Sequence, residues 1–423
     1  MNNAPMLQAF GRHEATLHQA DTLGTRLPHS AFFRGRTLSS HFQPIFSLAH
    51  RRAVGYEGLI RAHVNGIHES PAQLLALPES SKEKLKLDRI CRALHIQNFA
   101  SQNTDDSWLF INLDSQCLVA EQPGIGFTGE LLNMVGVEPH RLVIEIIESE
   151  ISDHAKLQHF ITHFRSLGCL IAIDDFGAGH SNIDRIWELE PDIVKIDRGL
   201  LARAGRSRQI ARLLNGLVSL IHEAGSLVVL EGVETEEEAL IAFSSNADMV
   251  QGFYFSKPQP TISDTSALAD RFDQLRRRHQ WETASRGADL QMYLQDIESL
   301  FRLAVSQLCA QGSFEQGSAL LFQDMRTVRC YLLDKEGYQL ARNIYAPHYQ
   351  HLLNARFTPL LCGNNANWAH KDYHYRAIQK PGMIHISKPY LSVADSHMCI
   401  TVSQAIQIGD QTQVLCCDVD WKD

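Results

Sequence analysis

The sequence predicts an α/β protein whose first two thirds form a (β/α)8, TIM-like barrel, followed by a smaller α+β domain. Two observations predict the barrel. Between residues 41 and 260, short apolar runs alternate with amphipathic helical stretches, as in parallel β/α proteins. Polar residues recur at the ends of the apolar runs, where a barrel places its active site: Glu57, Asn112, Glu145, Asp174, Asp175, Lys195, Glu231 and Gln251.

The expected elements of the barrel follow from these patterns. The apolar runs predict buried strands at Ala53–Tyr56, Trp108–Ile111, Leu142–Ile144, Leu170–Ile173, Ile193–Val194, Leu227–Leu230 and Asp248–Val250. Helices are expected at Leu85–Phe99, Lys156–Leu167 and Gln209–Ala224, with a covering helix near Asp264–His279. Gly168 and Gly225 follow two of these helices and suit their carboxyl ends.

The remainder of the chain has a different texture. A helix is expected at Ala288–Ala310, whose apolar stripe suits either a coiled-coil dimer or packing on its own domain. Strands are expected at Thr327–Leu333, Tyr338–Arg342, Met398–Ile408 and Val414–Asp420. We therefore predict an amino-terminal leader (1–36), a barrel (37–280), a connecting helix (281–313) and a sheet domain (314–423).

Composition limits the function. The 48 acids and 39 bases give a net charge of −9, which argues against binding bulk nucleic acid or an anionic membrane by charge alone. Nine scattered cysteines without metal-binding spacing suit reduced thiols in the cytoplasm. The absence of a membrane-length apolar run predicts a cytoplasmic protein without membrane insertion.

Five of the eight residues at the strand ends are acids, and so many carboxylates converge only if protons or cations neutralise them. Oxygen ligands favour two Mg²⁺ or Mn²⁺ ions over zinc, and phosphodiester hydrolysis is the natural reaction of such a site. An enolase-type site, which abstracts carbon-bound protons, is the alternative. Gly177 and Gly179 permit the turn that would bring Asp174 and Asp175 together.

Some of these residues also have purely structural interpretations. An isolated Asp-Asp pair commonly caps a helix. Lys195 and Asp197 share one face of a strand, but a Lys-x-Asp pair is often a surface ion pair. Glu148 and Glu234 each follow a strand-ending acid by three residues, so helix capping is as good an explanation as direct chemistry.

Residues 37–260 closely resemble the EAL domain of bacterial cyclic-di-GMP phosphodiesterases. The resemblance is carried, in order, by HFQPIFSL, GYEGLIR, FINLD, LVIEIIESE, IAIDDFGAGHSN, PDIVKIDRGL, VVLEGVET and DMVQGFYFSKP. It implies hydrolysis of cyclic di-GMP to linear pGpG, by a protein that forms a homodimer.

The resemblance also assigns roles. It implies that Glu57, Asn112, Glu145 and Asp174 hold one metal, and that Asp174, Asp175, Asp197 and Glu231 surround a second. It implies that Lys195 orients or deprotonates the attacking water and that Gln251 acts near it. Substrate contacts are implied for Gln43, Arg61, Asp197 and Glu234, and coupling of the loop to dimerisation for Glu148, Gly177 and Gly179.

The sequence departs from the family at three places. The name-giving tripeptide reads Glu57-Gly58-Leu59, and the missing methyl group is expected to loosen the strand end that carries Glu57. Ala178 and His180 follow Asp175 where Thr and Tyr are commoner, and the segment between Arg61 and Leu87 lacks the usual Trp and Pro-rich stretch. These departures leave the ligand set intact and favour an active enzyme over a silent receptor that only binds cyclic di-GMP.

The carboxyl-terminal domain resembles a PAS or Cache-type sensor that regulates the barrel. A pocket for an unknown small molecule is expected between Asn367–Arg376 and Ser387–Ser396, formed by Trp368, Tyr373, Arg376, Tyr390 and Asp395. The alternative is that these aromatic residues are ordinary core and the charges solvated.

Overall fold

The computed structural model describes residues 29–102, 106–113, 126–147, 154–179, 183–311, 313–349, 363, 365–392 and 397–421. The chain separates into two compact units, Met1–Trp281 and Glu282–Asp423. Among the described residues, no helix combines the length and the apolar character needed to span a membrane.

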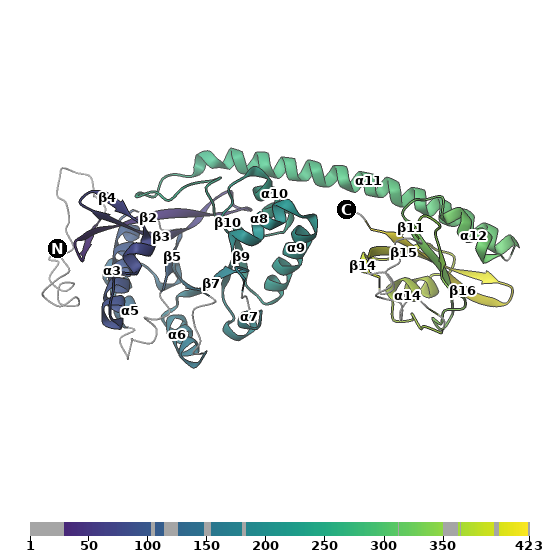
Figure 1. Cartoon of the computed structure of the whole chain (residues 1–423), viewed down its shortest axis with the longest axis horizontal. Coiled ribbons are helices and arrows are strands. Elements are labelled where there is room, and N and C mark those ends of the chain that lie inside the picture. The colour runs from purple at the N-terminus through teal and green to yellow at the C-terminus, as the bar shows by residue number, and fades with distance from the viewer. Residues whose placement is uncertain are drawn as a thin grey trace. The chain divides into compact units, whose positions relative to one another are not determined.

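The first unit is built on a closed barrel of eight strands (Figure 1), which confirms the predicted fold class. Hydrogen bonds connect the strands in the ring β2-β10-β9-β8-β7-β6-β5-β3, and β3 pairs back with β2. The bounds are β2 (Arg36–Ser47), β3 (Arg52–Val64), β5 (Trp108–Asn112), β6 (Leu142–Ile147), β7 (Leu170–Phe176), β8 (Ile193–Ile196), β9 (Leu227–Leu230) and β10 (Met249–Val250). Two short strands, β1 (Ala31–Phe33) and β4 (Ile67–Glu69), extend the β2–β3 pair.

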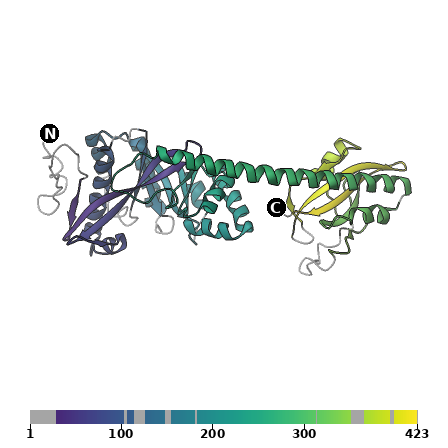
Figure 2. The same ribbon diagram turned by 90° about the horizontal axis from the view of Figure 1, so that it is seen from above.

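One strand differs from the all-parallel barrel that the sequence predicts. β2 runs antiparallel to both of its neighbours, β3 and β10. The reason is the connection: only a few residues join β2 to β3, and such a turn can link antiparallel strands but not parallel ones. The two long strands of this hairpin are seen from above in Figure 2.

Helices surround the barrel, with α3 and α5 beside β3 and β5, and α8, α9 and α10 beside β9 and β10 (Figure 1). Their bounds are α2 (Pro71–Leu75), α3 (Ser81–Ala100), α5 (Gly126–Val135), α6 (His154–Leu167), α7 (Asp184–Leu189), α8 (Arg198–Arg206), α9 (Arg208–Glu223) and α10 (Glu236–Ser244). Single 3₁₀ turns lie at Pro139–Arg141 and Ser266–Leu268. Gly168 and Gly225 have φ angles of +93° and +88° after α6 and α9, so the predicted helix stops are confirmed.

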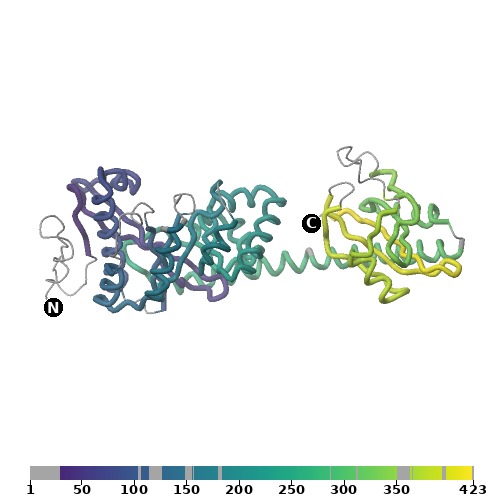
Figure 3. The backbone as a smooth tube through the Cα atoms, turned by 90° about the horizontal axis from the view of Figure 1, so that it is seen from below, coloured from purple at the N-terminus to yellow at the C-terminus, as the bar shows by residue number. Residues whose placement is uncertain are grey.

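A single helix, α11 (Ala269–Gln311), replaces the two helices expected in this region, and Figure 3 shows it as one continuous trace. The intervening segment contains no proline, and a single glycine, Gly287, costs only about 1 kcal/mol in a helix, so the helix continues through it. Phe272 and Leu275 belong to the barrel core. The apolar stripe that includes Ile297 and Phe301 is buried in the core of the second unit, as the own-domain interpretation predicted.

The second unit is an antiparallel sheet with flanking helices. The sheet has the order β12-β11-β16-β15-β13, and β14 also pairs with β15. The bounds are α12 (Phe314–Leu321), β11 (Thr327–Asp334), β12 (Ile344–Tyr345), α14 (Asp372–Gln379), β13 (His385–Ile386), β14 (Tyr390–Leu391), β15 (Met398–Ile408) and β16 (Gln411–Asp420).

The strand predicted at Tyr338–Arg342 is wrong. This segment forms only isolated bridges, from Gln339 to Leu333 and from Tyr338 to Asn367. The side-chain amide of Gln339 donates hydrogen bonds to the Ala341 carbonyl and to the Asn343 side chain, both at 2.8 Å. These local bonds turn the chain away from the ladder, and pairing resumes at β12.

A buried polar network connects α3 to β2. The Nδ1 atom of His95 lies 2.9 Å from the Ser40 hydroxyl, and the Asn98 amide donates to the same hydroxyl at 3.3 Å. Asn98 also exchanges two hydrogen bonds with the backbone of His29. Burial, with a smaller contribution from the charge of Arg61, lowers the pKa of His95 to about 3.

We expect the stability of the chain to depend on pH through His95. His95 of the unfolded chain takes up a proton near pH 6.5, whereas the buried imidazole of the folded chain stays neutral until about pH 3. The contribution of His95 to the free energy of unfolding is therefore complete above pH 6.5 and is lost as the pH falls toward about 3. Between pH 7 and pH 5, the free energy of unfolding of the wild type should fall by about 2 kcal/mol more than that of His95→Gln. Urea unfolding at the two pH values measures this difference. Parallel losses in the two proteins would contradict a neutral buried imidazole.

Candidate functional site

The interior of the barrel contains an apolar layer directly beneath a polar one. The apolar layer contains Ile45, Phe110, Val143, Ala172, Ile193, Val229 and Met249, which form one buried cluster. Side chains two residues apart on a strand share a face, so the next inward-facing positions are those of the predicted site. They are Gln43, Glu57, Asn112, Glu145, Asp174, Lys195, Glu231 and Gln251.

Lys195 is the centre of this polar layer. Its Nζ atom lies 2.5 Å from Glu145 Oε1, 2.6 Å from Glu231 Oε1 and 3.2 Å from Asp174 Oδ1. The Oε2 atom of Glu57 is 3.9 Å away. One ammonium group therefore faces carboxylates from four different strands or strand ends, and it is only 1% exposed.

Glu57 is fixed by two amides. Asn112 donates to its Oε1 atom at 2.8 Å, and Gln251 donates to its Oε2 atom at 2.7 Å. Asn112 ends β5 and Gln251 follows β10, so the amides reach Glu57 from the two flanks of β3 in the ring. Both carboxylate oxygens are thereby oriented, which reduces the side-chain entropy that a ligand would otherwise have to remove.

Asp174 and Asp175 reach the same site because β7 is irregular at this point. The pairing of β7 with β8 shifts register between Ile173 and Phe176, and Asp175 has a φ angle of +56°. A bulge of this kind turns a side chain that would otherwise face the helix layer. Asp174, Asp175 and Glu231 each offer a carboxylate oxygen within 4.8 Å of the others.

The electrostatics reflect the burial of these charges. Burial lowers the pKa of Lys195, but the four surrounding carboxylates outweigh it and raise that pKa well above its usual value. Burial raises the pKa of Glu145 well above its ordinary range, against the opposing effect of Lys195. The pKa of Glu231 rises to about 8, and that of Asp175 also rises, in both cases mainly through burial.

The residues present fit divalent metal ions. The Oε2 atom of Glu145 is buried and has no hydrogen-bond partner among the described residues, so it is a free ligand oxygen. The adjacent groups offer carboxylate and amide oxygens without sulfur, a donor set that suits Mg²⁺ or Mn²⁺.

Two predicted residues lie at the edge of the site with partners of their own. Asp197 caps α8 and accepts a hydrogen bond from the Gly199 amide at 2.8 Å, and its charge still raises the pKa of Asp175. The exposed carboxylate of Glu234 lies 3.6 Å from Arg198. The cap of α10 is Thr235, so of the two interpretations of Glu234 the helix cap is wrong.

Gln43 and Arg61 lie on the β2–β3 hairpin. Gln43 pairs directly with Glu57, and its amide donates to the Ser256 carbonyl at 3.3 Å. Arg61 lies two positions beyond Leu59 on the face that carries Glu57, is half-buried, and has its pKa lowered by that burial. Both residues therefore border the acidic layer.

Other predicted residues are placed differently. Gly177 and Gly179 follow β7 with φ angles of +101° and +134°. Glu148 and Asp395 lie outside the described residues.

In the second unit, Tyr373 is buried and stacks on Tyr390, with centroids 6.1 Å apart. Trp368 packs partly buried against the same cluster, and Arg376 is exposed.

The sequence analysis missed a buried network in the second unit. Arg329 donates to Asp418 at 2.8 Å, and Tyr331 and Thr401 donate to the other carboxylate oxygen at 3.1 and 2.7 Å. Tyr390 lies against the same oxygen at 3.4 Å. Neither charged residue stands in a recognisable motif, so only the pairing of β11 with β16 reveals the contact.

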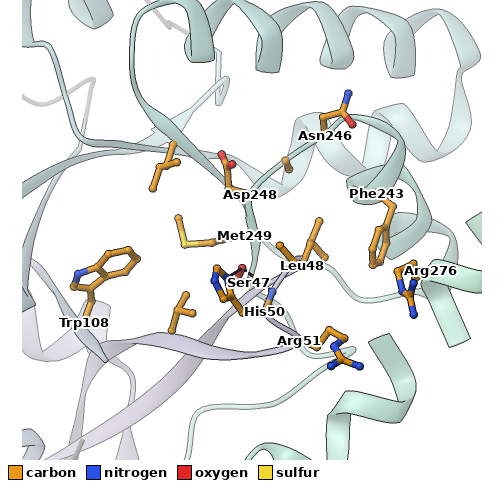
Figure 4. Close-up of a pocket in the computed structure, with 14 residues that line it drawn as sticks. Ser47, Leu48, His50, Arg51, Trp108, Phe243, Asn246, Asp248, Met249 and Arg276 are labelled. Atoms are coloured by element: carbon orange, nitrogen blue, oxygen red, sulfur yellow. Dashed lines mark hydrogen bonds between the residues drawn. The ribbon is translucent and has the colours of Figure 1, made fainter. Parts of the chain in front are cut away.

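A cavity of about 810 Å³ lies at the opposite, amino-terminal end of the parallel strands. In Figure 4, Trp108 lies on one side of it and Phe243 and Arg276 on the other. Its charged groups have partners: Asp248 accepts from His222 and from the Val228 amide at 2.8 Å, and Arg276 pairs with Asp273. Because the cavity lies at the amino-terminal end of the parallel strands, it is separate from the acidic layer at their carboxyl-terminal end.

The fold and the site define a closed eight-stranded α/β barrel with an acidic cluster at its carboxyl-terminal rim. The model of the EAL domain matches residues 26–258, which is more than half of the chain, and the protein belongs to this family.

Known relatives agree with this assignment. The EAL-domain protein YkuI of Bacillus subtilis is 26% identical over 353 residues, covering 80% of this chain and 84% of YkuI. The cyclic di-GMP phosphodiesterase NbdA of Pseudomonas aeruginosa is 27% identical over 251 residues, which cover 57% of this chain but only 31% of NbdA. The chain thus spans most of YkuI and about a third of NbdA.

Solved structures show the same fold. The crystal structure of YkuI with cyclic di-GMP and calcium matches with a TM-score of 0.75 at 24% identity, covering 91% of this chain and 97% of that one. The complex of Klebsiella pneumoniae BlrP1 with manganese and cyclic di-GMP matches with a TM-score of 0.51 at 26% identity, covering 60% of each chain.

We expect Lys195→Met to destabilise the metal-free protein by about 3–5 kcal/mol, because the buried carboxylates lose their cation. Mn²⁺ should stabilise this variant more than the wild type, since the ion replaces the missing charge. Urea unfolding with EDTA and with Mn²⁺ measures both effects.

The exposed Lys82→Met is the matched control and should change stability by less than about 0.5 kcal/mol. A Lys195→Met protein as stable as this control in EDTA would show that the carboxylates do not depend on the ammonium group.

Proposed function

We propose that this protein hydrolyses cyclic di-GMP to linear pGpG with two Mg²⁺ or Mn²⁺ ions. The observation that carries the proposal is the acidic layer around Lys195, in which Oε2 of Glu145 has no hydrogen-bond partner among the described residues. The names of the relatives agree with it: NbdA is a cyclic di-GMP phosphodiesterase, and BlrP1 binds manganese and cyclic di-GMP.

The acidic layer offers ligands for two ions. Glu57, Asn112, Glu145 and Asp174 lie on neighbouring strands and would hold one ion. Asp174, Asp175 and Glu231, whose oxygens converge, would hold the second, with Asp197 at its edge. When bound, such ions neutralise phosphoryl oxygens and lower the pKa of water.

In this proposal, Lys195 orients or deprotonates the attacking water. Its carboxylate neighbours raise its pKa and keep it as an ammonium ion, which donates hydrogen bonds and does not accept a proton. Bound divalent ions would lower this pKa again, so both roles implied for Lys195, orientation and deprotonation of the water, stay in the proposal. Gln251 anchors Glu57 through its amide, while its Oε1 atom is buried without a hydrogen-bond partner among the described residues and is available to a water.

The β2–β3 hairpin supplies the proposed substrate contacts. The guanidinium of Arg61 suits a phosphate or a guanine edge, and Gln43 offers an amide beside Glu57. Glu234 and Asp197 border the opposite side. In the reaction, water forms a new P–O bond and one of the two phosphodiester bonds breaks, so that the cyclic dinucleotide opens to linear pGpG.

We expect the purified protein to convert cyclic di-GMP to pGpG with Mg²⁺ or Mn²⁺, as measured by chromatography of the nucleotides. Glu57→Gln keeps the shape of the side chain but removes the charge held by Asn112 and Gln251, and should lower turnover at least about 100-fold. Glu130→Gln, exposed on α5, is the control and should match the wild type.

Binding of cyclic di-GMP without turnover would replace this proposal by the silent receptor that the sequence analysis considered. Neither binding nor turnover would contradict both.

We also propose that the second unit is a PAS- or Cache-like sensor that regulates the barrel. Its support is the buried pair of Arg329 and Asp418 beside Tyr331 and Tyr390, which couples two long strands to the predicted pocket segment. A small-molecule ligand, the homodimer and the cytoplasmic location remain predictions. Because the apolar stripe of α11 is buried within its own unit, a dimer would use another surface.

Asp418→Ala should change turnover at least about two-fold if the second unit regulates the first, because it removes the buried carboxylate to which Arg329, Tyr331 and Thr401 donate hydrogen bonds. Steady-state kinetics of the full chain measure this, and Lys388→Ala, exposed in the same unit, is the control. Unchanged kinetics in an Asp418→Ala protein whose second unit has lost stability would contradict regulation.

A further inference from the structure

We infer that the imidazole of His95, seated against Gly58, is a positioning residue for Glu57; this inference rests on the proposed role of Glu57 as a metal ligand. Successive side chains on a strand point to opposite faces, so Glu57 faces the barrel interior and position 58 faces the helix layer. There α3 places His95 behind the strand.

The contact at Gly58 leaves no room for a side chain. A Cβ atom added there would lie 2.9 Å from Cγ of His95, 3.1 Å from its Cβ and 3.2 Å from its Nδ1. The Cβ atom of His95 is fixed to α3 and its ring is bonded to the Ser40 hydroxyl, so an added methyl group would have to shift α3 or break that hydrogen bond. The imidazole therefore occupies the space that a methyl group at position 58 would take. The end of β3 is packed against His95 and is not loosened by the glycine as the sequence had led us to expect.

The imidazole is itself held in place. It is 3% exposed, and the Ser40 hydroxyl on β2 bonds to its Nδ1 atom. Asn98, one turn further along α3, bonds to the same hydroxyl. One ring thus connects α3 to both strands of the hairpin that carries Gln43, Glu57 and Arg61.

Glu57 is consequently supported from two directions. Asn112 and Gln251 hold its carboxylate in front, and His95 supports the backbone of the next residue from behind. Outer groups that orient a metal ligand typically change metal affinity or activity 10- to 100-fold when they are removed. His95 touches neither substrate nor metal in this scheme and acts only through the position of β3.

The test is a double-mutant cycle of Gly58→Ala and His95→Ala in the full chain. Mn²⁺ affinity is measured by isothermal titration calorimetry without nucleotide, beside urea unfolding and, at saturating Mn²⁺, kcat and KM. Gly58→Ala should weaken Mn²⁺ binding about 10-fold or more, because the methyl group displaces β3. The double variant should recover most of that loss, because removing the ring makes room for the methyl group.

His95→Ala alone provides a second measurement if Gly58→Ala does not fold. It should weaken Mn²⁺ binding several-fold, with kcat restored at saturating Mn²⁺. Two matched controls should bind Mn²⁺ like the wild type: Gly216→Ala, whose added Cβ meets no atom within 4 Å, and His68→Ala, which removes an exposed imidazole.

The outcomes separate the two proposals. Wild-type affinity in Gly58→Ala or in His95→Ala, even with reduced stability, would overturn the positioning role and leave the proposed function intact. A double variant no better than Gly58→Ala would also overturn it. A wild type that binds no Mn²⁺ would instead contradict the proposed function, on which the positioning role depends.

Discussion

The acidic site depends on the ion pairs between the buried ammonium group of Lys195 and the carboxylates around it. Three carboxylates lie within 3.2 Å of it, and Glu145 among them is fully buried. Burying like charges together in a medium of low polarity is unfavourable without a compensating cation. Lys195 supplies that cation from the centre of the barrel, while Oε2 of Glu145 has no hydrogen-bond partner in the part of the chain that the structure describes.

The barrel explains why these groups meet. Seven strands contribute an apolar side chain to the lower layer, and β3 has Gly55 at that level, where Phe110 fills the space. The polar side chain two residues away on each strand lies in the upper layer, so a single alternation builds both the core and the site. β2 takes part although it runs in the opposite direction, because Gln43 precedes Ile45 by two residues. The antiparallel hairpin thereby places Gln43 beside Glu57.

An irregular strand and close packing lie behind the groups of the site. The bulge in β7 presents Asp174 and Asp175 to one point, and the His95 ring fills the space behind Gly58. In the second unit, Asp418 also holds separate segments together, because four side chains bond to its carboxylate. In both units, buried polar groups with satisfied hydrogen bonds specify how neighbouring elements meet.

The sequence by itself determined the barrel, the strand ends and the acidic layer, because the period-two pattern and the polar residue after each apolar run are local features. It did not determine the direction of β2, the continuity of α11 or the irregular path of Tyr338–Arg342. Only the tertiary structure decided that His95 lies against Gly58 and that Arg329 meets Asp418. Such contacts join residues 37 and 89 positions apart, and no local pattern encodes which distant side chains share a space.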